Sequence, residues 1–99
     1  MMIQATIKKK NNEIFWYRVE GHASFDEIGK DIVCAGVSSL YITVTNTLLS
    51  LGRTFERDKG YFVLDATVKE QVALNILYDG IKSIADEYPD FCKVEVIEV

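Results

Sequence analysis

The stretch that most constrains the fold runs from Asp31 to Gly52, which is long for a strand and contains no proline. Its apolar residues recur at three- and four-residue spacing, which is typical of one face of an α-helix: Ile32, Val33, Val37, Leu40, Tyr41, Val44, Leu48 and Leu51. The segment 41–45 is rich in β-branched residues and would suit a strand by propensity alone. Because the run is long and unbroken, we predict one buried helix, capped by Asp31 and ending near Gly52.

Most of the segments on either side of this helix are predicted to be strands. Alternating or β-branched residues predict strands over 2–9, 13–20, 53–58, 61–68 and 91–99, with turns at 11–12 and around 59–60. A second amphipathic helix is predicted over 67–88, where Pro89 stops it. The order β-β-α-β-β-α-β, with strands in hairpins, predicts an α+β fold in which two helices cover a mostly antiparallel sheet in two layers.

Length and charge limit the classes of protein to consider. The 99 residues predict a single domain over 1–99, and the net charge of −4 argues against nucleic acid as a direct partner. We find no stretch approaching a membrane span of about 18 apolar residues and no signal peptide, so we expect no membrane partner and a cytoplasmic location. The two cysteines, Cys34 and Cys92, are expected to stay reduced there, with Cys92 in the core.

The chemistry-bearing residues are the single histidine, His22, and Cys34, which follows it after a short polar loop. The predicted helix start places Cys34 in the first turn, where unpaired N–H groups and the helix dipole favour a thiolate. A thiolate beside an imidazole is the minimum requirement for cysteine nucleophilic catalysis. The alternative is an inert core thiol and a surface histidine, and the two residues alone leave both interpretations open.

Other polar residues could support such a pair. Asp31 suits a helix cap and, alternatively, the group that orients His22; Asp26 and Glu27 could also orient it. Ser38 and Gly21 are candidates for lining the site, because Ser38 can donate a hydrogen bond and Gly21 is next to His22 in the sequence. Two cysteines and one histidine at these spacings predict no metal site, and nothing in the sequence indicates a cofactor.

The stretch GHASFDEIGKDIVCAGVSSL, residues 21–40, resembles the signature of the ribosomal-processing cysteine protease (Prp) family. The matching residues are Gly21, His22, Ala23, Gly29, Asp31, Ile32, Val33, Cys34, Ala35, Val37 and Ser38. Gly36 departs from the pattern, since alanine is expected there. The resemblance covers essentially the whole chain, and the motif is specific because it includes both reactive residues and their separation.

The resemblance implies a homodimeric cytoplasmic cysteine endopeptidase with Cys34 as the nucleophile and His22 as the general base. It also implies a substrate: the N-terminal extension of a large-subunit ribosomal protein of the L27 type, cut after a Phe-Phe pair. Two alternatives stay open from the residues themselves. One is a non-catalytic ribosome-assembly or peptide-binding module, and the other is a thiol hydrolase acting on a small molecule, which would need a closed pocket.

Overall fold

The computed structural model describes residues 2–21 and 28–99. The elements are β1 (Ile3–Lys10), β2 (Glu13–Glu20), α1 (Ile28–Leu51), β3 (Thr54–Arg57), β4 (Gly60–Val63), α2 (Val68–Glu87) and β5 (Cys92–Glu98). This is the predicted β-β-α-β-β-α-β order, and the α+β class is confirmed. Most predicted boundaries differ from the observed ones by only a few residues.

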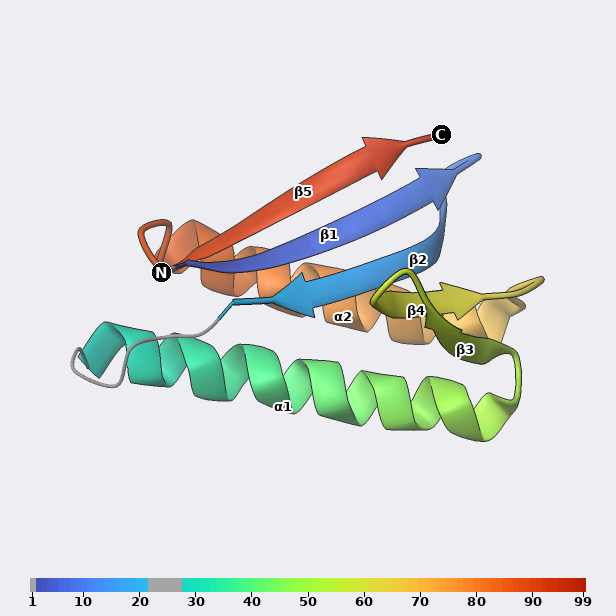
Figure 1. Ribbon diagram of the computed structural model, residues 1–99, viewed down its shortest axis with the longest axis horizontal. Helices are drawn as coiled ribbons and strands as arrows, with labels where there is room; N and C mark the ends of the chain where they lie inside the picture. Colours follow the sequence, from blue (N-terminus) through green and yellow to red (C-terminus); the bar gives the residue numbers. More distant parts are fainter. Residues whose placement is uncertain (1, 22–27) are drawn as a thin grey trace.

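The five strands form one sheet in the order β3-β4-β2-β1-β5. All neighbouring pairs are antiparallel except β1 and β5, which are parallel and come from opposite ends of the chain. Both helices cover the same face of the sheet and run antiparallel to each other (Figure 1). β2 ends, and α1 begins, at the same end of the molecule (Figure 1).

Two tight turns join the hairpins, and both use residues with positive φ. Asn11 and Asn12 have φ of 52° and 64°, as expected for asparagines in a turn that requires left-handed backbone. Asp58 and Lys59 form the second turn with φ of 53° and 63°. The prediction centred that turn one residue too late, because Gly60 was taken for a turn residue and is instead the first residue of β4.

The core lies between the sheet and the helices. β1 contributes Ile3, Ala5 and Ile7; α1 contributes Val33, Val37, Val44 and Leu48; α2 contributes Leu74, Leu77 and Ile81; and all are buried. Fully burying an aliphatic side chain of this size stabilises a fold by about 1.5–3 kcal/mol. These residues therefore fix the positions of both helices, including the helix that carries Cys34.

The contact between the two helices depends on glycines. A Cβ added to Gly80 would lie 2.7 Å from Cδ1 of Leu40, which is closer than real Cβ contacts allow. A Cβ added to Gly36 would lie 3.0 Å from Cδ1 of Ile84. Gly36 thus departs from the alanine expected in the family pattern at a position where α1 and α2 pack closely.

α2 begins with a capping box. The Thr67 backbone N–H donates to Oε1 of Glu70 at 2.6 Å, and the Thr67 hydroxyl donates to the same oxygen. These hydrogen bonds hold the pKa of Glu70 below its usual range, and the bond from the Thr67 hydroxyl has the largest effect. The predicted helix over 67–88 is therefore correct within one residue at each end, with Thr67 and Tyr88 as caps.

One sequence expectation about α1 is wrong. Its segment Ile32–Leu51 is long and apolar enough, by length and composition, to cross a membrane. The prediction missed this because it counted only strongly apolar residues, whereas the serines and threonines between them carry no charge. A single helix of this kind is weak evidence for a membrane span, because core helices of other proteins pass the same test.

Candidate functional site

Cys34 lies in the second turn of α1, not in the first as predicted. The helix begins at Ile28, one turn earlier than predicted. The prediction was late because polar residues at this end of the helix interrupt the apolar periodicity on which it depended. The unpaired backbone N–H groups of the helix start therefore belong to residues 28–31. Cys34 is partly exposed and packs against the edge of the core, so its thiol is neither sealed inside nor fully in solvent.

His22, the predicted partner of Cys34, lies outside the described residues, as do the alternative orienting residues Asp26 and Glu27. The backbone of Asp31 is inside α1, so its predicted role as the residue that caps the helix is wrong. The reason is again the earlier helix start. The pairing of Cys34 with an imidazole stays a prediction.

The two candidate lining residues lie at the expected end of the molecule. Ser38 follows Cys34 by one helical turn, so it shares the same side of α1, and it is exposed. Gly21 follows the last residue of β2 with a φ of 101°, a conformation that favours glycine. A Cβ at Gly21 would collide with the carbonyl oxygen of Met2, so the chain can leave β2 beside β1 only without a side chain at this position.

A buried hydrogen bond holds α1 against β2. The hydroxyl groups of Tyr17 on β2 and Thr45 on α1 lie 2.8 Å apart, and both residues are buried. The sequence did not predict this pair, since Thr45 was not part of the apolar pattern assigned to the helix. The sequence signal that could have suggested this pair is a tyrosine in a predicted strand together with a threonine next to a core position of the predicted helix. The bond fixes the register of the Cys34 helix against the sheet.

Three tyrosine rings surround this bond. Tyr17 stacks on Tyr61 with ring centroids 5.7 Å apart, and Tyr41 packs edge-on against both. Burial raises the pKa of Tyr17 well above its usual value, although the hydrogen bond to Thr45 opposes the shift. Burial, and next the neighbouring Tyr61, also raise the pKa of Tyr41. The cluster is therefore neutral at physiological pH and serves as a packed support beside the site.

Cys92 has the core position that was predicted for it. It is 2% exposed on β5, and burial raises the pKa of its thiol. Both cysteines are free thiols. The two therefore differ in accessibility, and Cys34 is the one that a substrate could reach.

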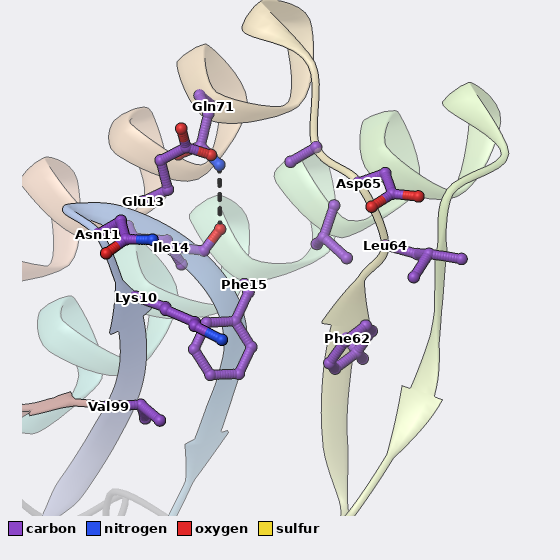
Figure 2. A pocket seen from close by; sticks show the side chains of 12 residues that line it. Lys10, Asn11, Glu13, Ile14, Phe15, Phe62, Leu64, Asp65, Gln71 and Val99 are labelled. Carbon is purple, nitrogen blue, oxygen red and sulfur yellow. Dashed lines mark hydrogen bonds between the residues drawn. The ribbon is translucent and has the colours of Figure 1, made fainter.

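A cavity of about 580 Å³ lies away from Cys34, near the turn that joins β1 and β2. It opens where β2 and β4 separate, between Phe15 on one side and Phe62 and Leu64 on the other (Figure 2). The side-chain amide of Gln71 donates to the Ile14 carbonyl at 3.1 Å beside it. Its described lining contains no cysteine or histidine, so it does not supply the chemistry predicted for Cys34.

Comparisons with known proteins agree with the sequence motif. Residues 2–93 match the family model of Cysteine protease Prp. The Ribosomal processing cysteine protease Prp of Bacillus subtilis (strain 168) is 32% identical over 94% of this chain and 96% of its own length.

Solved structures have the same fold. SMU.848 from Streptococcus mutans superposes with a TM-score of 0.78 at 31% identity, covering 99% of this chain and 96% of that one. An essential ribosomal processing protease Prp from S. aureus, in complex with a covalently linked product peptide, has a TM-score of 0.78 at 23% identity and covers 96% of this chain and 99% of that one.

Proposed function

Since this chain belongs to the cysteine protease Prp family and is a cysteine peptidase, we propose that it processes a ribosomal protein. The proposed substrate is the N-terminal extension of a large-subunit ribosomal protein of the L27 type, cut after a Phe-Phe pair in the cytoplasm. The curated relative is named a ribosomal processing protease, and the S. aureus relative was captured with a covalently linked product peptide. The net charge of −4 suits a basic ribosomal protein as substrate.

In the proposed mechanism, Cys34 is the nucleophile and His22 is the general base. His22 takes the proton of the thiol, and the sulfur forms a bond to the scissile carbonyl carbon. The C–N bond then breaks, and the imidazolium returns the proton to the leaving amine. A water molecule, activated by the same imidazole, hydrolyses the thioester and frees the thiol. Backbone N–H groups near the start of α1 are the proposed donors to the oxyanion.

The observation that carries this proposal is the accessible thiol of Cys34, on a helix fixed by the core, within the matched family region. The test is cleavage of a peptide that contains Phe-Phe before a small residue. We expect Cys34→Ala to abolish cleavage and Cys92→Ala, which removes the buried thiol, to retain it. Undiminished turnover by Cys34→Ala would refute the mechanism, whereas peptide binding without cleavage by the wild-type protein would favour the non-catalytic peptide-binding module.

We also propose that the protein acts as a homodimer through α1. No charged residue occurs from Ile32 to Leu51, although one side of this helix faces solvent. Ile32, Ile42 and Leu49 are 53%, 57% and 44% exposed on that helix. An uncharged, partly apolar helix surface is typical of an interface. Sedimentation should therefore show a dimer, and Ile42→Lys should shift it toward the monomer; a monomeric wild-type protein would contradict this proposal.

A further inference from the structure

The outer edge of β2 is only half covered by its neighbour. β4 pairs with β2 at Trp16 and Tyr17 alone, whereas β1 pairs with β2 along nearly its whole length. Toward the end of β2, past Tyr17, the neighbouring chain is no longer β4 but the turn at Asp58 and Lys59 that precedes it. The last residues of β2 therefore form a free sheet edge within the described part of the chain. Free edges accept an additional strand readily.

The backbone groups that face this edge can be assigned. A Cβ on Gly60 would collide with the carbonyl oxygen of Tyr17, so the polar groups of Tyr17 point toward β4. Along an antiparallel strand, every second residue directs its N–H and C=O to the same neighbour. Val19 therefore directs both groups outward, and none of the described backbone hydrogen bonds pairs them. Arg18 and Glu20 point the other way, into the ladder with β1.

This edge leads toward Cys34. The contact between Thr45 and Tyr17 fixes where α1 lies alongside β2. Cys34 lies about 16 Å from Thr45 along the helix, at 1.5 Å per residue. Gly21 lies about 13 Å from Tyr17 along the strand, at about 3.3 Å per residue. Because α1 and β2 run in opposite directions (Figure 1), Cys34 is close to level with the end of the free edge.

We propose that the substrate peptide binds as an added β-strand on the outer edge of β2. One peptide residue exchanges backbone hydrogen bonds with Val19, and the scissile bond follows within about three residues, at Cys34. This inference rests on the proposed peptidase function, because the peptide that binds the edge of β2 is taken to be the substrate that Cys34 attacks. Binding through the backbone holds the peptide extended, and every second peptide N–H then points at β2 and the others away from it.

The direct test uses the full-length enzyme and a set of Phe-Phe peptides, each N-methylated at one residue on the amino-terminal side of the cut. We expect at least a tenfold loss of kcat/KM when the methyl replaces an N–H that faces β2, and little loss at the residues between. The methylated peptides that keep their inward N–H groups are the matched controls. Equal cleavage of all peptides, or losses without alternation, would overturn the inference. Failure to cut even the unmodified peptide would refute the proposed function itself.

A protein variant provides an independent test. Val19→Pro removes the outward N–H and the valine side chain, and it should leave the hydrogen bonds of the ladder with β1 in place, since proline is tolerated on strand edges. Val19→Ala shortens the same side chain and keeps the N–H. We expect kcat/KM to be about tenfold lower for Val19→Pro than for Val19→Ala, chiefly through KM, with equal alkylation rates of Cys34 by iodoacetamide. Equal kcat/KM for the two folded variants would overturn the inference. If Val19→Pro does not fold, the cleavage rates of the N-methylated peptides test the inference instead.

Discussion

Removing one hydroxyl from the Tyr17–Thr45 pair should weaken the attachment of α1 to β2. The two oxygens lie 2.8 Å apart, and the residues are 0% and 5% exposed, so neither hydroxyl can be compensated by bulk water. Thr45→Val leaves the Tyr17 hydroxyl buried without its partner, which costs about 1–3 kcal/mol of folding free energy. Tyr17→Phe should cost less, about 0.5–1.5 kcal/mol, because the Thr45 hydroxyl can instead donate to the Tyr41 carbonyl one turn earlier.

The assay is urea unfolding followed by fluorescence of Trp16, the single tryptophan, which is 4% exposed in the fold. The double variant should lose less free energy of unfolding than the sum of the two single variants, with a coupling of about 0.5 kcal/mol or more. Thr43→Val, an exposed substitution on the same helix, is the control and should change the free energy by less than about 0.5 kcal/mol. Strictly additive effects, or single losses no larger than that of the control, would refute the reasoning.

Three further outcomes follow from the structure. Glu70→Gln should lower the Tm near pH 7, because the fold lowers the pKa of Glu70 and the ionised carboxylate is therefore stabilising. This stabilisation is lost as the pH falls below about 4.3, the ordinary pKa of a glutamate. Thermal scans of the variant and the wild type should therefore converge in acid. Gly80→Ala should lower the Tm despite the better helix propensity of alanine, because its Cβ meets Leu40; a higher Tm would contradict the packing. Iodoacetamide should label Cys34 in the native protein and Cys92 only after unfolding, as mass spectrometry can show; early labelling of Cys92 would contradict its burial.

The sequence was sufficient for the order of elements because hydrophobic period and turn chemistry agreed along most of the chain. The range 13–20 was predicted without error, since aromatic and β-branched residues fill it between an Asn-Asn turn and a glycine. The start of α1 was predicted one turn too late. Its first residues include Gly29, Lys30 and Asp31, and a pattern of apolar side chains cannot detect a helical turn in which such residues predominate.

Features that depend on pairing between distant segments could not be predicted from the local sequence. Thr45 lies in a β-branched stretch, and only the fold brings it beside Tyr17. The free edge of β2 likewise depends on where β4 ends, which follows from the length of a different hairpin. The candidate nucleophile was identified from its motif, because the types of residue and their spacing are themselves the signal.

The most direct test of the central claim is covalent capture of the nucleophile. A peptide that ends in Phe-Phe and carries a chloromethyl ketone should add one equivalent of inhibitor to the native protein, and digestion followed by mass spectrometry should place it on Cys34. A matched peptide ending in Gly-Gly should react far more slowly, and the Cys34→Ala variant should gain no mass. Labelling that is absent from Cys34, or that is equally fast with both peptides, would contradict the account.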